Sequence, residues 1–232
     1  SITGNTADNG GGVYMTGANS KFNMYGGEIS RNTTTTGNGG GVYVGGGQFT
    51  MYGGTISGNT TTTGNGGGVY MIGDQFTMYG GEISGNTATV SGGGVSVSGG
   101  TFTMSGGRIT GNNGSGVFVN DGTKFIVSGA PTVTGNTRNR DIDSNVYLTG
   151  GTDTTITIGT GGLTDGASIG VTKGASRLGS VIATGATKDY SGKFFVDDNK
   201  YKVGYDETHK QLVLAEKDTS AETHTHCLCG KT

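Results

Sequence analysis

Residues 39–59 read GGGVYVGGGQFTMYGGTISGN, and the same order of marks returns along the first two thirds of the chain. Glycines precede a short valine-led segment, a phenylalanine follows, and an isoleucine or valine then precedes an asparagine. The recurring positions are Val13, Val42, Val69, Val95, Val117 and Val146; Phe22, Phe49, Phe76, Phe102 and Phe125; and Asn32, Asn59, Asn86, Asn112 and Asn136. Self-similarity at a period of 22–29 residues indicates a solenoid.

The differences in repeat length are confined to one segment. From phenylalanine to asparagine the chain takes 10, 10, 10, 10 and 11 residues, whereas from asparagine to the next valine it takes 10, 10, 9, 5 and 10. Loops tolerate such changes and packed strands do not. Each repeat therefore combines a fixed part with a variable loop.

Each repeat contains three short runs in which apolar and polar residues alternate, for example residues 42–44, 49–51 and 55–57. Alternation with a period of two predicts strands, and the glycine pairs between the runs disfavour a helix. Three strands and three bends per repeat predict one coil of a parallel β-helix, with coils ~4.8 Å apart. The fold class is therefore all-β: a single-stranded parallel β-helix of about six coils with a C-terminal β-rich cap.

The same alternation predicts which side chains form the core. Valine, phenylalanine, methionine and isoleucine should point inward and stack on their equivalents in the next coil, whereas the intervening tyrosine, threonine and serine side chains should point outward. A buried amide is costly unless it is hydrogen-bonded, so the asparagines are predicted to bond to one another in a ladder. Its predicted members are Asn5, Asn32, Asn59, Asn86, Asn112 and Asn136. The glycines supply positive φ angles and close approach at the bends.

The composition excludes several classes of protein. The chain has 232 residues with 51 glycines but one proline, which excludes collagen and polyproline linkers. Its net charge of −2 gives no electrostatic reason to expect nucleic acid or anionic lipid as a partner. No apolar run approaches the ~18 residues that would cross a bilayer, so we expect no membrane insertion. No cofactor is expected, and the chain is expected to be a monomer.

The repeat pattern in residues 1–160 resembles right-handed parallel β-helix proteins of the pectate-lyase-like superfamily. It is most similar to large adhesin-type surface proteins of Gram-positive gut bacteria, and more distantly to chlamydial polymorphic outer-membrane proteins. The resemblance implies a right-handed coil and an extracellular location, on the bacterial surface or secreted. It says little about activity, because this fold carries lyases, hydrolases, adhesins and capsid spikes.

Three segments are predicted: β-helix repeats over residues 1–162, a β-rich cap over 163–217, and a linker or the start of a truncated further module over 218–232. The opening residues 1–5 read as the last strand of a coil, which favours a fragment of a longer repeat array. In the cap, strands are expected at 167–172, 193–196, 201–205 and 211–215.

Outward tyrosines are the main candidate for a binding site. The first predicted ladder contains Tyr14, Tyr43 and Tyr70, and the second contains Tyr25, Tyr52 and Tyr79. Rows of amphipathic rings suit stacking against sugars or a protein partner. Stacked tyrosines also stabilise neighbouring strands without any ligand, and this alternative stays open.

Other candidate sites are weaker. Glu28 and Glu82 occupy equivalent outward positions two coils apart, ~9.6 Å between backbones, at the edge of the spacing of an inverting glycosidase. The segment Asp141–Asp143 reads as a turn rather than a calcium site. The threonine runs 33–36 and 60–63 are expected in solvated loop. The tail holds His224, His226, Cys227 and Cys229, a weak metal motif that lacks a complementary pair of ligands.

The sequence favours a non-enzymatic, extracellular, adhesin-like surface module that contacts a host protein or glycan through the tyrosine ladders. The alternatives are a carbohydrate-active enzyme, either a glycoside hydrolase or a polysaccharide lyase, with Glu28 and Glu82 as acid and base, and a structural stalk without a ligand.

Overall fold

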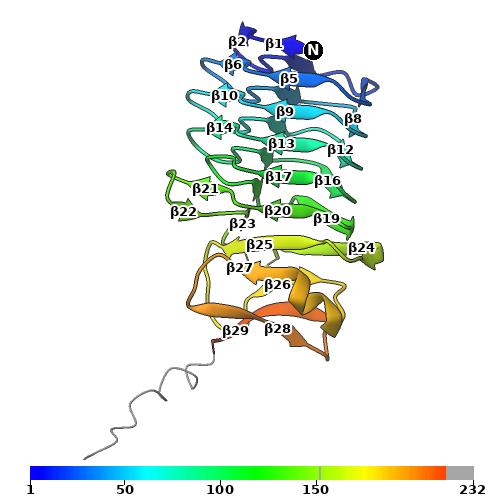
Figure 1. Ribbon diagram of the computed structural model, residues 1–232, viewed down its shortest axis with the longest axis vertical. Coiled ribbons are helices and arrows are strands. Elements are labelled where there is room, and N and C mark those ends of the chain that lie inside the picture. Colours follow the sequence, from blue (N-terminus) through cyan, green and yellow to red (C-terminus); the bar gives the residue numbers. More distant parts are fainter. Residues whose placement is uncertain (152, 218–232) are drawn as a thin grey trace, which may run out of the picture.

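Three strands form in each coil because the two-residue alternation is interrupted by glycine turns that a helix could not accommodate. The structure is a computed structural model that describes residues 1–151 and 153–217. Equivalent strands of successive coils lie in parallel, so that the molecule is an elongated column of coils (Figure 1). The all-β parallel solenoid predicted from the repeat is confirmed, with about seven turns instead of six.

The strands form three stacks along the column. The first stack is β3 (Val13–Met15), β7 (Val42–Val44), β11 (Val69–Met71), β15 (Val95–Val97), β18 (Val117–Val119) and β23 (Val146–Leu148). The second is β4 (Lys21–Met24), β8 (Gln48–Met51), β12 (Gln75–Met78), β16 (Thr101–Met104), β19 (Lys124–Gly129) and β24 (Ile156–Leu163). The third is β1 (Ile2–Thr3), β5 (Glu28–Ser30), β9 (Thr55–Ser57), β13 (Glu82–Ser84), β17 (Arg108–Thr110) and β20 (Thr132–Thr134).

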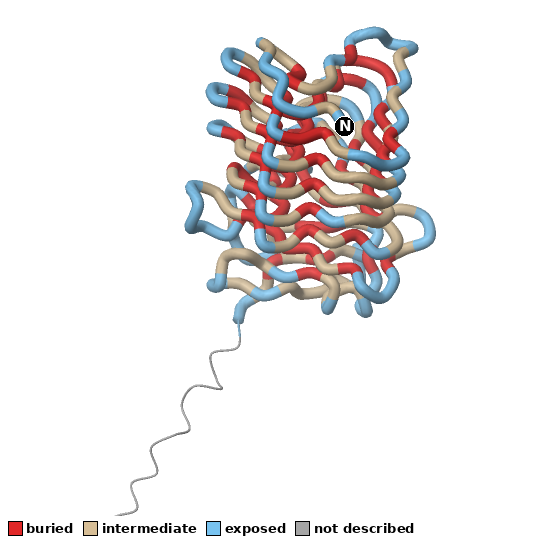
Figure 2. Tube along the Cα trace, turned by 45° about the horizontal axis from the view of Figure 1, so that its top comes forward, coloured by how far each residue is buried: buried red, intermediate tan, exposed pale blue. Residues whose placement is uncertain are grey.

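The core consists of columns of like residues. Phe49, Phe76, Phe102 and Phe125 are fully buried, and their rings stack at centroid distances of 4.6–4.9 Å with interplanar angles of 6–11°. Those distances equal the spacing between parallel strands, about 4.8 Å. Figure 2 shows the buried positions lining the inside of the coils. The predicted inward set is therefore confirmed.

Each triple glycine is required by the backbone of the neighbouring coil. Gly66 has a φ of +68°, in the left-handed region that favours glycine. A Cβ on Gly67 would lie 2.5 Å from the carbonyl oxygen of Thr87, and one on Gly68 would lie 2.6 Å from that of Gly94. The first glycine thus makes the turn, and the next two let successive coils approach closely.

The threonine runs are solvated loop, as predicted, only in their second halves, where Thr35, Thr36, Thr62 and Thr63 are exposed. Their first halves belong to a fourth parallel stack of two-residue strands that the prediction missed: β2 (Thr6–Ala7), β6 (Thr33–Thr34), β10 (Thr60–Thr61) and β14 (Thr87–Ala88). Thr34 and Thr61 are fully buried, and the Thr61 hydroxyl donates to the carbonyl of Gly37 at 2.8 Å. Two-residue strands are too short to give a periodicity signal, which is why the sequence did not reveal them.

The asparagines form the predicted ladder. From Asn32 to Asn145, each Oδ1 accepts both the backbone N–H and the side-chain Nδ2–H of the preceding asparagine, at 2.9–3.1 Å. From Asn32 onward to Asn136 the Nδ2 also donates to a strand carbonyl, as from Asn59 to Ile29 at 2.9 Å. Every amide dipole therefore points the same way along the column.

The ladder continues past the predicted set and ends on a carboxylate. Asn136 donates to Asn145, and Asn145 donates its backbone N–H and its Nδ2–H to the two oxygens of Asp197, at 2.8 and 2.6 Å. Thr172 donates to the same carboxylate at 2.8 Å. Burial raises the pKa of Asp197, and these hydrogen bonds act in the opposite direction. A carboxylate, which only accepts hydrogen bonds, suits this position because the groups of Asn145 and Thr172 that face it are all donors.

Parallel pairing continues beyond the repeats. In β25 (Ser168–Lys173) the first half pairs with β20 and the second half with β23, so one strand joins the first and third stacks. The chain then forms β26 (Val181–Thr184), the 3₁₀ helix η1 (Lys188–Lys193), β27 (Phe194–Val196), β28 (Tyr201–Asp206) and β29 (Gln211–Glu216). The four predicted cap strands correspond to β25, β27, β28 and β29, while β26 and η1 were not predicted.

The antiparallel pair β28–β29 closes the column through β26, which also pairs in parallel with β24. The buried Lys173 ties this end together, since its Nζ donates to the carbonyls of Gly151 and Thr154 at 2.9 and 2.6 Å. A second antiparallel hairpin, β21 (Thr137–Arg138) and β22 (Ile142–Asp143), projects from the side of the column (Figure 1). Of the segment predicted as a turn, Asp141 lies in the hairpin turn, whereas Ile142 and Asp143 form strand β22.

Asn59→Ala removes an acceptor that serves two buried donors of Asn32, and a donor to the carbonyl of Ile29. We expect a loss of stability at the upper end of the ~1–3 kcal/mol typical of one orphaned buried group, or beyond it. Chemical denaturation measures this loss, with the exposed Asn23→Ala in the same region as the control. An unfolding free energy equal to that of the control would contradict the ladder's role.

Asp197→Asn leaves an Oδ1 that can accept both hydrogen bonds of Asn145, as elsewhere in the ladder. Because burial raises the folded-state pKa of Asp197, its contribution to stability is fully present below its ordinary pKa of 3.8 and is lost as the pH rises through the folded-state pKa. The melting temperature of the native chain relative to Asp197→Asn should therefore fall as the pH rises above 3.8. Asp198→Asn is the control. A native chain that gains stability over Asp197→Asn with rising pH would refute this assignment.

Candidate functional site

The second tyrosine ladder is an exposed row of parallel rings. Tyr25, Tyr52 and Tyr79 each follow directly after β4, β8 and β12. Their ring centroids lie 4.8 and 5.2 Å apart, with interplanar angles of 3° and 11°. Tyr25 is 73% exposed and Tyr79 is 54% exposed. The rings pack on one another and keep their outer edges in solvent, so they are available to a ligand.

The first ladder is more tilted and more enclosed at its centre. Tyr14, Tyr43 and Tyr70 lie on β3, β7 and β11, with centroids 4.9 and 5.4 Å apart and interplanar angles of 36° and 39°. Burial raises the pKa of the Tyr43 phenol, and the two neighbouring tyrosines raise it further. The central phenol of this ladder, that of Tyr43, is therefore the most enclosed of the three.

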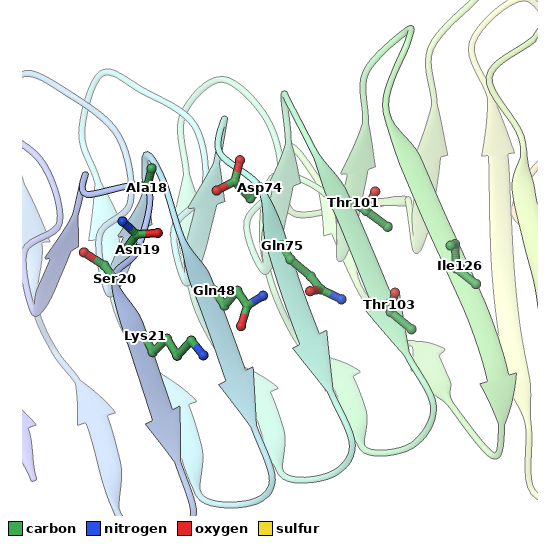
Figure 3. Close-up of a pocket in the computed structure, with 10 residues that line it drawn as sticks. All are labelled: Ala18, Asn19, Ser20, Lys21, Gln48, Asp74, Gln75, Thr101, Thr103 and Ile126. Carbon is green, nitrogen blue, oxygen red and sulfur yellow. The ribbon is translucent and has the colours of Figure 1, made fainter.

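A groove runs along the second stack, over residues that come between the two ladders in the chain. It has a volume of about 770 Å³ and is lined by Ala18, Asn19, Ser20, Lys21, Gln48, Asp74, Gln75, Thr101, Thr103 and Ile126 (Figure 3). Lys21, Gln48 and Gln75 project from successive strands β4, β8 and β12 in one row. The carboxylate of Asp74 accepts the backbone N–H of Gly47 at 3.0 Å, which fixes the loop at the rim. We call this feature the amide groove.

Strand register places two outward rows on this face. The row nearer the rim is Lys21, Gln48, Gln75, Thr101 and Lys124, and the next is Asn23, Thr50, Thr77, Thr103 and Ile126. The tyrosines of the second ladder come four residues after the first row, just beyond the ends of the same strands, and none of them lines the groove. The second stack thus carries amides and hydroxyls on its outward positions and is followed by exposed aromatic rings.

The structure separates the six predicted tyrosines into two surfaces. Along the chain, the strands that carry the first ladder come before the loop at the rim of the groove, whereas the second ladder comes after the strands that form the groove. Aromatic ring contacts among the described residues occur within each ladder and not between them. The groove itself was missed, although the signal was present: Gln48 and Gln75 stand directly before the repeated phenylalanines.

The two candidate catalytic carboxylates lie outside this groove. Glu28 and Glu82 are both in register with Thr55 on the third stack, so they stand two rungs apart as predicted. Glu82 is in register with Arg108 on its other side. Neither glutamate lines the amide groove, and the pair remains a weak candidate on its spacing alone.

No three His, Cys, Asp or Glu side chains within residues 1–151 and 153–217 gather into a group that could hold a metal ion. The tail motif with His224, His226, Cys227 and Cys229 lies outside the described residues. In the described part of the chain, no helix is long and apolar enough to cross a bilayer.

Comparison with known proteins gives the family. The family described as "Right handed beta helix region" matches residues 1–160, more than half of the chain. The chain belongs to this family, and its coil is right-handed. Neither a search of curated proteins nor a search of solved structures gave a match. Because β-helices occur in both enzymes and non-enzymes, the family defines the architecture and leaves the activity open.

Tyr79→Ala removes the ring that stacks on Tyr52 and should lower the free energy of unfolding by about 0.5–1.5 kcal/mol. Phe76→Ala, three residues earlier in β12, opens a cavity in the core and should cost about 3–5 kcal/mol. Chemical denaturation of the two variants compares them directly. Equal losses would mean that the tyrosine ladder is a structural element as important as the core.

Proposed function

We propose that this chain is a non-enzymatic, extracellular, adhesin-like surface module that binds a host glycan along the amide groove and the adjoining second tyrosine ladder. The observation that carries the proposal is the juxtaposition of Gln48 and Gln75, in one row across the groove, with the stacked and exposed rings of Tyr25, Tyr52 and Tyr79 at the far ends of the same strands. The groove runs along the column, so it suits an extended ligand.

The chemistry of the face fits a sugar chain. Amide groups donate and accept hydrogen bonds at once, as sugar hydroxyls do, and threonine hydroxyls add further partners. Exposed aromatic rings offer apolar faces at low entropic cost. Lys21 and Asp74, both on the lining, balance one another in charge, which favours a neutral ligand for this groove. A host protein that presents an extended segment is the alternative ligand.

The absence of a carboxylate pair from the groove lining supports a binding role over a catalytic one. Glycoside hydrolysis requires two carboxyl groups that flank the bond to be cleaved. Asp74 is the acidic residue of the groove lining, and its carboxylate holds a backbone N–H. Glu28 and Glu82, on the third stack, stand away from the groove.

The test is binding of the purified chain to glycan and host-protein arrays, with three paired variants. Tyr52→Ala/Tyr79→Ala and Gln48→Ala/Gln75→Ala should each weaken binding about tenfold or more, the equivalent of about 1.4 kcal/mol or more. Tyr43→Ala/Tyr70→Ala, in the first ladder, is the matched control and should bind as the native chain does. Circular dichroism checks that each variant is folded.

Three outcomes would overturn the proposal in different ways. Lost binding in Tyr43→Ala/Tyr70→Ala alone would place the ligand on the first ladder. Release of reducing ends from a polysaccharide, abolished by Glu82→Gln, would establish an enzyme. No ligand on either array would leave the structural stalk as the function.

A further inference from the structure

A second cavity lies where the repeat is shortest. From Asn112 to Val117 the chain takes 5 residues, against 9 or 10 in the equivalent loops. The fourth stack consequently continues below β14 only through single bridges, from Thr87 to Asn113 and from Asn113 to Thr137. The missing loop leaves a notch of about 330 Å³ between the loop after β14 and the hairpin β21–β22, which projects beside it (Figure 1). We call this cavity the loop notch.

The notch differs in charge from the amide groove. Its charged lining residues are Arg138 and Arg140, and no carboxylate belongs to the lining. Asp141 and Asp143 are on the same hairpin, but both are exposed and neither lines the cavity. Within residues 1–151 and 153–217, neither guanidinium forms a salt bridge. Two arginines therefore line one cavity, and neither has a salt-bridge partner among the described residues.

Arg138 is held in place in a way that leaves its donors available. Its guanidinium carbon lies 5.2 Å from the ring centroid of Tyr147, and that ring stacks on Phe118 at 5.5 Å and 5°. A guanidinium in a cation–π contact keeps its N–H groups, which can bind a planar anion in a bidentate manner. The stack thus orients Arg138 before any ligand arrives.

The hairpin tip that carries Arg140 is also fixed. The backbone N–H of Arg140 donates to the Oδ1 of Asn113 at 3.1 Å. Asn139 and Arg140 both have positive φ angles, +55° and +72°, which non-glycine residues adopt uncommonly. The tip is therefore anchored against the shortened loop, and the distance between the two arginines is set by the fold.

The remaining lining suits a sugar. Thr87, Thr89 and Asn139 add hydroxyl and amide groups, and the 59% exposed Val90 offers an apolar contact. The volume is at the lower end of the ~300–1,000 Å³ typical of small-molecule sites, so it fits a single ring better than a folded partner. We infer that the loop notch binds an acidic saccharide, with its carboxylate or sulfate group on Arg138 and Arg140. This site is separate from the amide groove and does not depend on it.

The experiment titrates the ¹⁵N-labelled chain with glucuronic acid and with glucose 6-sulfate, which separate the two anion types, and with glucose as the neutral control. Both acidic sugars should shift the backbone amide signals of Asn113, Asn139 and Arg140, and glucose should not. Arg138→Gln/Arg140→Gln should raise the dissociation constant of the acidic sugars about tenfold. Arg31→Gln/Arg177→Gln makes the same change in net charge at two exposed arginines elsewhere and should change the constant less than about twofold.

The inference is overturned if neither acidic sugar shifts these signals at about 50 mM, or if both arginine pairs weaken binding equally. Shifts caused by a hexaglutamate peptide but not by the sugars would also overturn it, because the ligand would then be a protein. Should the double variant fail to fold, Arg140→Gln alone still tests the site, with an expected loss of about threefold. Tyr52→Ala/Tyr79→Ala should leave these titrations unchanged, so failure of the groove proposal and failure of this one give different results.

Discussion

The distance between coils, about 4.8 Å, is the constraint on which the rest of the structure depends. Every repeated feature of a coil must place its atoms directly over the equivalent atoms of the neighbouring coil, one spacing away. Aromatic rings meet this condition by stacking face to face, and glycines meet it because they have no side chain to collide with the neighbouring coil. The asparagine amide meets it most specifically, because its Oδ1 accepts two donors from the coil before it while its Nδ2 donates to a strand carbonyl of that same coil. A buried polar column of this kind is stabilising only if every member is satisfied, and no buried side-chain polar atom of the described residues lacks a partner.

The same constraint creates both candidate binding surfaces. Where the repeat is regular, outward residues also fall into rows, so one useful residue becomes a row of equivalent groups. The amide groove and the second tyrosine ladder arise in this way. Where the repeat is irregular, a loop is missing and the column is locally open. The loop notch arises there, and the hairpin with Arg138 and Arg140 fills part of the space. Regularity thus favours an extended ligand and irregularity a compact one.

The core and the ladder could be predicted because they follow from the repeated spacing of Phe and Asn, which needs no knowledge of distant contacts. The fourth stack could not, since Thr33–Thr34 and its equivalents are too short to alternate. Neither could the last two members of the ladder: Asn145 lies nine residues after Asn136, and Asp197 comes from the cap, 52 residues further on. Long-range contacts of single residues carry no periodic signal. The groove depends on which outward rows share a face, and the repeat contained that information.

The equivalence of successive coils also bears on how such a chain changes in length during evolution. Thr60 is in register with Thr87, so residues 60–86 form a complete 27-residue unit. If recombination between the repeated codons removed that unit, Asn59 would meet Asn112 with the hydrogen bonds it now makes to Asn86. The column would become shorter by a single rung, while the cap and the first coil would be unchanged. Length is therefore a trait that this architecture can vary in whole steps, independently of its ends.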